Sequence, residues 1–538
     1  MPDVDPITLE IANHRLAAIA EEMGVVLCRT ALSPNIKERR DYSCAVFDAA
    51  GMLVAQAAHI PVHLGSTPLS VRAAIEKVAM APGDVVMLND PFAGGTHLPD
   101  VTVVAPVFRA GDCRPFGFVA NRAHHADIGG MDPGSMPLGT EIFQEGVRIP
   151  PVHLVRGGAL VRDVLELLLA NVRVPDERTG DLLAQWAALR VGAERLVALC
   201  QRLGGRAALT RQTTALQDYS ATLMRALLRG LPAGTYRARD VLDGDGRGSG
   251  RLPVVVKITV SRGRAHVDFS GSAPQTRGPV NANFAVTRSA VLYVFRALSD
   301  DPIPPNEGLA RPLTIEAPAG TIVNASFPAA VAGGNVETSQ RIVDVLLRAL
   351  APAAPGRVPA ASCGSMNNVA LGGVVGGRAF AYYETLAGGA GGGPDHAGAS
   401  GVHTHMTNTL NTPIEALEAY YPLRVTRYAL RPGSGGAGRH RGGDGLVREI
   451  EFLAPARVTL LAERRDVAPW GLWGGRDGKP GQDRLVRNGR SRRLTGKTAI
   501  DVEVGDRLRV ETPGGGGFGR PRRTRRPKPP SPSSRSSC

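Results

Sequence analysis

The chain has 538 residues, 43% of them hydrophobic, with 65 glycines, 41 prolines and a formal charge of +14. This length and composition predict a globular chain of about two to four domains with many tight turns, and the lack of any run of eighteen apolar residues excludes a membrane-spanning helix. The acidic amino terminus has no apolar signal core and the scattered cysteines form no CxxC pair, so we expect a cytoplasmic protein with no membrane partner.

The positive charge is concentrated at the carboxyl end of the chain. Residues 520–538 hold seven Arg or Lys and no acidic residue. This composition predicts a disordered, solvated basic tail behind a mildly basic globular body. Because only this tail resembles a nucleic-acid-binding segment, we expect no nucleic-acid partner for the folded part.

The first elements are a helix and two strands. Apolar residues recur at helical spacing over residues 6–33, and short strands are expected over 43–48 and 52–56 around an Ala-Ala-Gly turn. His59 and His63 follow these strands. Two interpretations are open for these histidines: they line a site, or they have a structural or surface role. A helix then starts near Ser66-Thr67, where a hydroxyl can cap it.

The most informative stretch runs from Asn89 to Gly130. It contains the pattern His-x-x-Asp twice, at His97/Asp100 and His124/Asp127. Apolar, β-branched segments VTVVAPVF and FGFVANRA lie between the two patterns and are typical of paired strands. Such a hairpin would return His124 close to His97 and Asp100.

Imidazole and carboxylate side chains without a neighbouring cysteine suit Mn²⁺, Fe²⁺ or Zn²⁺ and argue against a structural zinc site. Pro99 favours extended backbone, so the first pattern belongs to a loop or strand end rather than a helix face. Three ligands would leave positions open for water or substrate. The alternative is a polar loop with surface histidines.

Beyond the hairpin, a glycine-rich segment over residues 129–151 is expected to form a pocket wall. It carries the polar side chains of Asp132, Glu141, Glu145 and Arg148. Residues 160–204 and 206–231 have helical period. The segments VVVKITV and AHVDFS predict a hairpin that begins a more β-rich region.

Helices are expected over 287–298 and 336–350, and a second polar region covers residues 381–422. This region supplies Glu384, Asp395, His396, His403, His405, Asn408 and Glu415. It is glycine-rich but lacks GxxxxGK[ST], so it does not indicate a nucleotide site. Two interpretations of this region remain: a substrate pocket built from loops, or a surface loop. The run Gly514–Gly517 precedes no helix and is not a dinucleotide-binding fingerprint.

Together these features predict a mixed α+β, multi-domain chain. We expect an N-terminal α/β region with the metal-site loops over 1–160, a helical segment over 161–235, an α+β region with the glycine-rich polar loop over 236–430, a β-rich region over 431–519 and the tail over 520–538.

The chain resembles the hydantoinase B/5-oxoprolinase family. The resemblance covers residues 5–519 in the order of the family motifs, which read here as NDPFAGGTHLPDVTVVAPVF, RAHHADIGG, EGVRIPP, NEGLARPL, GGNVETSQRI, GVHTHMTNTLNTPIEALE, GAGRHRGGDG and TPGGGGFG. It implies the B-type component of an ATP-dependent hydantoinase or oxoprolinase, which opens a cyclic amide such as hydantoin, N-methylhydantoin or 5-oxoproline. Alternatives are a subunit of the acetone/acetophenone carboxylase type and a non-catalytic scaffold subunit.

The resemblance also implies a set of site residues and partners. His97, Asp100 and His124 would bind a divalent Mn, Zn or Fe ion, with Asp127 as an outer or fourth ligand. His125, next along an extended strand, would point away from His124. We expect further catalytic or supporting roles for Glu145, Arg148, His403 and His405. We expect a substrate pocket lined by Asn89, Asp90, Asn408 and Glu415. ATP and Mg would be used by a separate hydantoinase A-type subunit in a hetero-oligomer.

Overall fold

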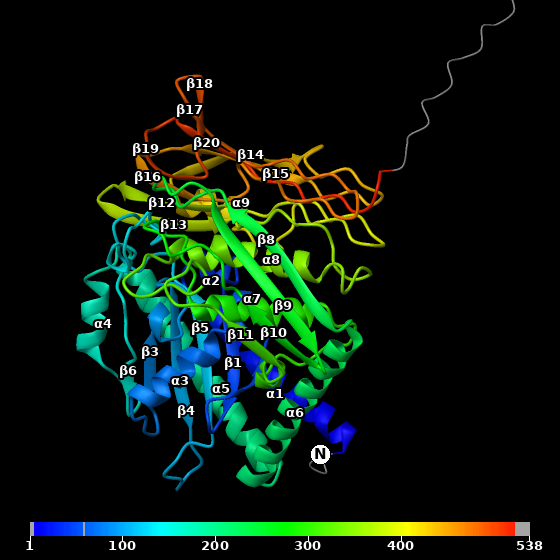
Figure 1. Ribbon diagram of the computed structural model, residues 1–538. Coiled ribbons are helices and arrows are strands. Elements are labelled where there is room, and N and C mark those ends of the chain that lie inside the picture. Colours follow the sequence, from blue (N-terminus) through cyan, green and yellow to red (C-terminus); the bar gives the residue numbers. More distant parts are fainter. Residues whose placement is uncertain (1–4, 58–59, 522–538) are drawn as a thin grey trace, which may run out of the picture.

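The structure is a computed structural model that describes residues 5–57 and 60–521. The expectations for His59 and for residues 522–538 of the basic tail therefore fall outside the described residues. Over the described ranges, helices pack against four β-sheets (Figure 1), which confirms the mixed fold. No helix in these ranges is long and apolar enough to cross a membrane.

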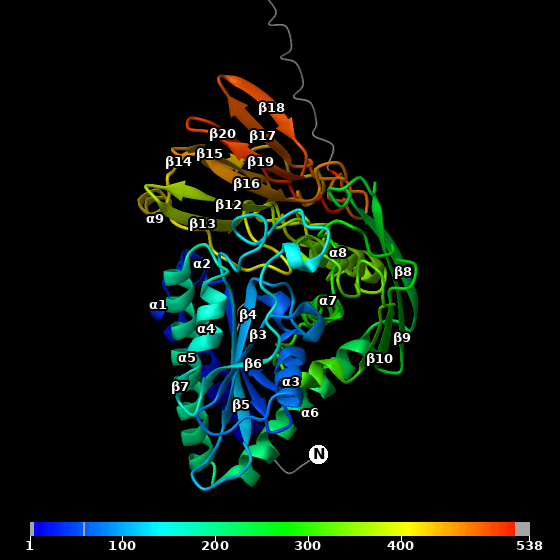
Figure 2. The same ribbon diagram turned by 90° about the vertical axis from the view of Figure 1, so that its left-hand side faces the viewer.

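The N-terminal region is built on an antiparallel sheet with the order β2-β1-β5-β4-β3-β6-β7. Its strands are β1 (Tyr42–Asp48), β2 (Leu53–Gln56), β3 (Val85–Leu88), β4 (Asp100–Val107), β5 (Gly117–His124), β6 (Val152–Arg156) and β7 (Ala159–Leu160). The central strands β4 and β5 are buried along their whole length, because helices cover both faces of the sheet (Figure 2). The site residues therefore sit on rigid, enclosed backbone.

One face of this sheet is covered by α1 (Pro6–Thr30) and α5 (Pro175–Arg202), and the other by α3 (Thr67–Lys77). Helix α1 begins where Asp5 accepts hydrogen bonds from the backbone N–H groups of Ile7 and Thr8, at 3.0 Å each. The helix expected over 160–204 is interrupted. It forms α4 (Arg162–Leu169) and α5, because Pro175 favours extended backbone before it and starts a new helix.

A second sheet, with the order β11-β10-β9-β8, packs against α6 (Arg206–Gly230), α7 (Phe284–Ala297) and α8 (Ser339–Leu350). Its strands are β8 (Gly234–Leu242), β9 (Leu252–Ser261), β10 (Arg264–Asp268) and β11 (Leu313–Glu316). Strand β9 alternates buried and half-buried residues, as expected for a strand with one face on a core. This core is continuous with the face of the first sheet that carries α3.

The C-terminal region contains two further antiparallel sheets that enclose a separate apolar cluster. One has the order β13-β12-β16-β19, formed by β12 (Asn368–Val375), β13 (Arg378–Thr385), β16 (Ala456–Leu461) and β19 (Lys497–Val502). The other has the order β14-β15-β20-β17-β18, formed by β14 (Leu423–Arg431), β15 (Gly445–Phe452), β20 (Arg507–Glu511), β17 (Gln482–Arg487) and β18 (Arg490–Leu494). Glu384, expected in a polar loop, lies instead in β13, where it is buried beside Arg448 at 3.5 Å.

The glycine-rich segments pack backbone against backbone. A Cβ at Gly515 would lie 2.0 Å from the carbonyl oxygen of Ala390, and one at Gly443 would lie 1.9 Å from that of Ala399. Hydrogen bonds also join these segments, for example from the N–H of Gly515 to the oxygen of Gly443 at 2.9 Å. The glycines are required here by close packing.

Short helical segments complete the described chain. They are α2 (Pro34–Lys37), η1 (Pro61–His63), η2 (Pro91–Ala93), η3 (Ile142–Gln144), η4 (Glu307–Ala310), the π-helical η5 (Gly334–Thr338) and α9 (Ile414–Tyr420). Several of them lie next to the site described below. The domain boundaries expected near residues 160, 235, 430 and 519 stay predictions.

Candidate metal centre

The β4–β5 hairpin brings the two sequence patterns together. Asp100 is the first residue of β4 and His124 the last residue of β5, and the two are direct partners in the antiparallel register. His97 lies just before β4, after a loop in which Gly94 has a φ of +88°. A side chain at Gly94 would collide with the backbone of Leu69 at 2.5 Å, so this loop depends on glycine.

His97, Asp100 and His124 form a compact buried cluster. One potential ligand atom from each lies within 4.8 Å of the other two. The Nε2 atom of His97 is 3.4 Å from Oδ2 of Asp100, and the two imidazole rings meet edge to face at 5.0 Å between centroids. The cluster therefore offers two nitrogens and one oxygen around a common point.

The outer atoms of both imidazoles are held by the surrounding protein. Nδ1 of His97 lies 3.3 Å from the carbonyl oxygen of Ala332, and Nδ1 of His124 lies 3.1 Å from Nδ2 of Asn35. The His124 ring also stacks on Tyr383 at 4.5 Å, with 6° between the planes. Nε2 of each histidine is buried and has no hydrogen-bond partner. Both rings are thus fixed, and apart from the 3.4 Å approach of the His97 Nε2 to Asp100 neither Nε2 faces a protein partner.

His63 is the residue of this site that the sequence leaves undecided. Its Nε2 lies 3.3 Å from Oδ2 of Asp100 and its Nδ1 lies 2.8 Å from Oγ of Ser43. The hydroxyl of Thr96 donates to the same oxygen of Asp100. The proline-led turn η1 places His63 here, and no spacing to the His-x-x-Asp patterns could have shown it.

The electrostatics favour an ionised Asp100 beside a neutral His124. Burial alone would raise the pKa of Asp100, but His97 and His63 hold it well below its ordinary value. Burial, reinforced by His97, lowers the pKa of His124 well below its ordinary value. An ionised carboxylate and neutral imidazoles are the protonation states in which these groups bind metal ions.

A small cavity opens onto this cluster. It has a volume of about 20 Å³, which accommodates about one water-sized occupant. His63, Asp100 and His124 line one side, and Asp41 also borders it. Burial raises the pKa of Asp41 to about 6, although Arg39 opposes the shift. The cavity therefore contains a carboxyl group that can exchange a proton near neutral pH.

Glu145 supports the cluster indirectly. Its Oε1 accepts hydrogen bonds from the backbone N–H groups of Val331 and Ala332, both at 2.8 Å. The carbonyl of Ala332 in turn contacts His97. Burial raises the pKa of Glu145 to about 8, although these two backbone donors lower it. Glu145 thus fixes the backbone segment that orients a candidate ligand.

The second half of the HHAD motif is not part of the cluster. The carboxylate of Asp127 pairs with Arg173 at 2.9 Å and accepts the N–H groups of Gly129 and Arg173. The ring of His125 contacts Gln185 of α5, with 2.9 Å between Nε2 and Oε1. Both residues anchor the end of β5 to the helical layer.

Asn89, Asp90 and Arg148 shape the loop before His97. The Asn89 amide donates to the carbonyls of Leu98 and Val147 at 2.8 and 2.9 Å. Asp90 caps η2 and lies 3.4 Å from Arg148. Through these contacts Asn89 and Asp90 stabilise the loop that carries His97.

His403 and His405 lie near the cavity but outside the cluster. Nδ1 of His403 lies 3.5 Å from Oγ1 of Thr407, which lines the cavity. Nδ1 of His405 lies 3.3 Å from the hydroxyl of Tyr293. Burial lowers the pKa of both histidines. Glu415 is exposed on α9.

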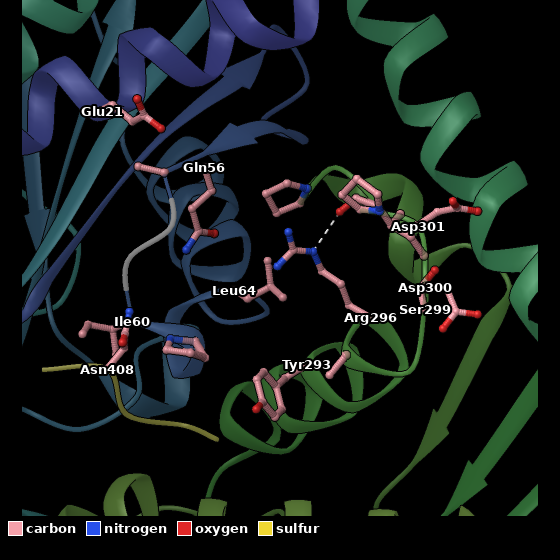
Figure 3. A pocket seen from close by; sticks show the side chains of 16 residues that line it. Glu21, Gln56, Ile60, Leu64, Tyr293, Arg296, Ser299, Asp300, Asp301 and Asn408 are labelled. Atoms are coloured by element: carbon pink, nitrogen blue, oxygen red, sulfur yellow. Dashed lines mark hydrogen bonds between the residues drawn. The ribbon is translucent and has the colours of Figure 1, made fainter. Parts of the chain in front are cut away.

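Asn408 lines a larger open pocket of about 500 Å³ that shares Ile60 with the cluster cavity. Figure 3 shows Gln56, Ile60 and Leu64 on one side of this pocket and Tyr293 and Arg296 of α7 on the other. Arg296 is tied by its Nε to the carbonyl of Ile303 at 2.8 Å. The open pocket and the cluster cavity thus have one lining residue in common, Ile60.

The residues of the cluster fit a divalent metal ion. Two buried Nε2 atoms without partners and one ionised carboxylate oxygen converge beside a cavity of atomic size, and this donor set suits Mn²⁺, Fe²⁺ or Zn²⁺. Nδ1 of His97 faces the carbonyl oxygen of Ala332, as is usual for a metal-binding histidine, whereas Nδ1 of His124 faces the side-chain amide nitrogen of Asn35. Fold and site together define a mixed α+β protein with a candidate metal centre of the two-His, one-carboxylate type.

A family model described as hydantoinase B/oxoprolinase matches residues 5–521, and the chain belongs to this family. It is 43% identical over 524 residues to an uncharacterized protein of Methanocaldococcus jannaschii, covering 96% of this chain and 91% of that one. It is 41% identical to 5-oxoprolinase 1 of Arabidopsis thaliana, covering 96% of this chain but only 42% of the plant protein. The chain therefore spans less than half the length of that relative.

Bacterial proteins and solved structures complete the comparison. The chain is 32% identical to the B-type component of a putative D-/L-hydantoinase from a Pseudomonas species, covering 96% of this chain and 90% of that one. The ATP-dependent caprolactamase of Pseudomonas jessenii matches with a TM-score of 0.88 and 31% identity, covering 96% and 92%. Acetone carboxylase matches with a TM-score of 0.89 at 19% identity, covering 96% and 76%, which is a likeness of fold.

Proposed function

We propose that this chain is the B-type component of an ATP-dependent hydantoinase or oxoprolinase type of enzyme, which opens a cyclic amide such as hydantoin, N-methylhydantoin or 5-oxoproline by hydrolysis. The observation that carries the proposal is the buried cluster of His97, Asp100 and His124, with both Nε2 atoms free. The names of the Arabidopsis and Pseudomonas relatives support the substrate class.

In this proposal His97, Asp100 and His124 hold a divalent ion, which supplies Lewis acidity toward a carbonyl or water oxygen when bound. Ala332 and Tyr383 keep the two imidazole rings in position. Asp41 lines the same cavity and has a pKa of about 6, so it is suited to accept a proton from an attacking water near neutral pH.

ATP and Mg²⁺ are assigned to a separate A-type subunit. The glycine-rich segments around Gly389, Gly443 and Gly515 are filled by backbone contacts, which supports the placement of ATP on another chain. The Pseudomonas hydantoinase relative is itself named as one component of a larger enzyme, and the plant 5-oxoprolinase is more than twice as long as the matched part. A hetero-oligomer follows from this division of roles.

The carboxylase alternative rests on a likeness of fold at 19% identity, so the hydrolase is preferred. A scaffold subunit without chemistry would have no need of a buried His–Asp–His cluster with unpartnered nitrogens. Turnover of cyclic amides and of ketones by the complex with an A-type subunit separates the hydrolase from the carboxylase.

The first experiment is elemental analysis of the purified full chain beside His97→Ala and His125→Ala. We expect about one Mn, Fe or Zn ion per chain in the wild type and its loss in His97→Ala, because removal of one of three ligands leaves a poor site. His125→Ala is the matched control, since its ring contacts Gln185 outside the cluster. Metal-free folded wild type, or full metal content in His97→Ala, contradicts the proposal.

A further inference from the structure

The open pocket next to the cluster cavity contains a cation without a carboxylate partner. Arg296, the penultimate residue of α7, lines this pocket of about 500 Å³ (Figure 3). Its Nε donates to the carbonyl oxygen of Ile303 at 2.8 Å. Within residues 5–57 and 60–521 no carboxylate pairs with its two terminal nitrogens. The side chain is therefore fixed at one nitrogen, and its remaining N–H groups are available to a ligand.

The charge of Arg296 is not compensated by its surroundings. Burial by the neighbouring protein lowers the pKa of the guanidinium, and no carboxylate of the described residues opposes this shift. The residue is nevertheless exposed, because the pocket is open to solvent on one side. A cation in a partly desolvated pocket interacts more strongly with an anion than a cation in bulk water does, so an anionic group of a ligand would be stabilised here.

The acidic residues of the pocket lie at its rim. Glu21, Asp300 and Asp301 line the pocket, and all three are exposed. Asp300 pairs with Arg357. Figure 3 shows Asp300 and Asp301 directed away from Arg296. Because exposed charges are largely compensated by water and salt, these carboxylates do not cancel the attraction of Arg296 for an anion.

The rest of the pocket suits the apolar body of a small ring. Its wall includes Ile60, Leu64 and Ile303. A volume of about 500 Å³ is typical of small-molecule sites, whereas the cluster cavity of about 20 Å³ holds only a water-sized occupant. A cyclic amide therefore fits the open pocket, and it does not fit inside the cluster cavity.

The open pocket and the cluster cavity are adjacent along two segments of the chain. Both are lined by Ile60. Asn408 lines the open pocket, and its neighbours Thr407 and Thr409 line the cavity. A ligand held by Arg296 thus lies beside the candidate metal centre and outside its small cavity.

We propose that the open pocket binds the carboxylate of a cyclic amide, or of its ring-opened product, with Arg296 as the anchoring cation. The planar guanidinium can pair with a carboxylate through two parallel hydrogen bonds. The inference rests on the proposed function and deepens it. Among the candidate substrates, 5-oxoproline carries a carboxylate, whereas hydantoin and N-methylhydantoin do not. Hydrolytic ring opening creates a carboxylate in every case, so the same contact also suits a product.

The test is isothermal titration calorimetry of the purified full chain with 5-oxoproline, 2-pyrrolidinone and L-glutamate. The first two share a five-membered lactam ring and differ in the carboxylate. We expect the wild type to bind 5-oxoproline about 10- to 100-fold more tightly than 2-pyrrolidinone, the range for hydrogen bonds between charged groups. Arg296→Gln should lose this preference. Arg296→Lys should keep part of it, because lysine retains the charge but not the planar geometry. Ser299→Ala is the matched control, since it changes an uncharged residue of the same pocket and should keep the full preference.

The third ligand identifies the source of the carboxylate. Tighter binding of 5-oxoproline than of L-glutamate supports a substrate carboxylate, and the reverse order supports a product carboxylate. Equal binding of 5-oxoproline and 2-pyrrolidinone, no binding of any of the three ligands, or an unchanged preference in folded Arg296→Gln would overturn the inference. Each of these failures leaves the metal analysis of His97→Ala unaffected. A folded wild type without metal would instead reject the proposed function, and the binding assay remains valid in that case because it requires no metal.

Discussion

Glu145→Ala tests whether the Glu145 carboxylate, which holds the backbone that contacts His97, contributes to metal affinity. Glu145 touches neither Asp100 nor His124, but it accepts the N–H groups of Val331 and Ala332 at 2.8 Å each. The carbonyl of Ala332 then orients Nδ1 of His97 at 3.3 Å. Removal of the carboxyl group should therefore loosen His97, a candidate metal ligand that it does not contact.

The magnitude follows from these contacts. Two buried N–H groups lose their acceptor, at about 1–3 kcal/mol each, so unfolding should become easier by about 2–6 kcal/mol. Loss of an outer partner of a metal ligand lowers metal affinity by about 10- to 100-fold. Because Glu145 acts through Ala332 rather than on His97 itself, we expect about a tenfold loss, which corresponds to about 1.4 kcal/mol.

The assay is a competition titration with a chromophoric chelator, together with urea unfolding of the metal-free chain. Glu145→Gln retains an acceptor oxygen and should restore affinity close to that of the wild type. Glu141→Ala removes an exposed carboxyl group four residues earlier in the chain and should change nothing. If folded Glu145→Ala binds metal as tightly as the wild type, the relay through Ala332 does not operate.

Two further predictions concern buried groups elsewhere. Burial raises the pKa values of Glu145 and Glu337 to about 8. Their contribution to the free energy of unfolding is therefore fully present below pH 4.5, their ordinary pKa, and is lost as the pH rises through about 8. Urea unfolding across this window should show a steeper fall for the metal-free wild type than for Glu337→Gln, and parallel curves would refute the assignment. Gly515→Ala would place a Cβ 2.0 Å from the Ala390 oxygen and should lower the free energy of unfolding by about 1–3 kcal/mol. Gly356→Ala, which meets no atom within 4 Å, should be neutral, and urea unfolding of both variants measures the difference.

The core of the candidate site could be predicted because its residues are local. His97, Asp100 and His124 belong to one hairpin, and a strand pattern is enough to show that the second strand returns to the first. The expectation that His124 and His125 point to different surroundings follows from the alternation of side chains along a strand. The structure places them beside Tyr383 and Gln185, respectively.

The rest of the site could not be predicted, because it comes from residues distant in sequence. The motif GGNVETSQR indicates only the start of a helix. The π-helical turn that directs Asn335 into the cavity depends on the contact of Gly334 with Asn281, which no local pattern reveals. His63 is similar, since its bond to Asp100 joins residues 37 positions apart. Strands β12 and β13 escape prediction because glycine and alanine dilute their β-forming residues.

The location of the cluster explains why one cavity needs nearly the whole chain. Asp100 and His124 end strands of the first sheet, Tyr383 belongs to the C-terminal sheet with β12 and β13, and Asn335 begins the segment that leads into α8. The three regions meet at this point, where one apolar cluster joins residues of the first sheet, α8 and β13. A fragment that contained only the hairpin would keep the three candidate ligands, but it would lose the stacking partner of His124 and the carbonyl of Ala332. We infer that metal binding and the packing of these three regions are coupled, so that metal removal should weaken the contact of Tyr383 with His124 before it unfolds either sheet.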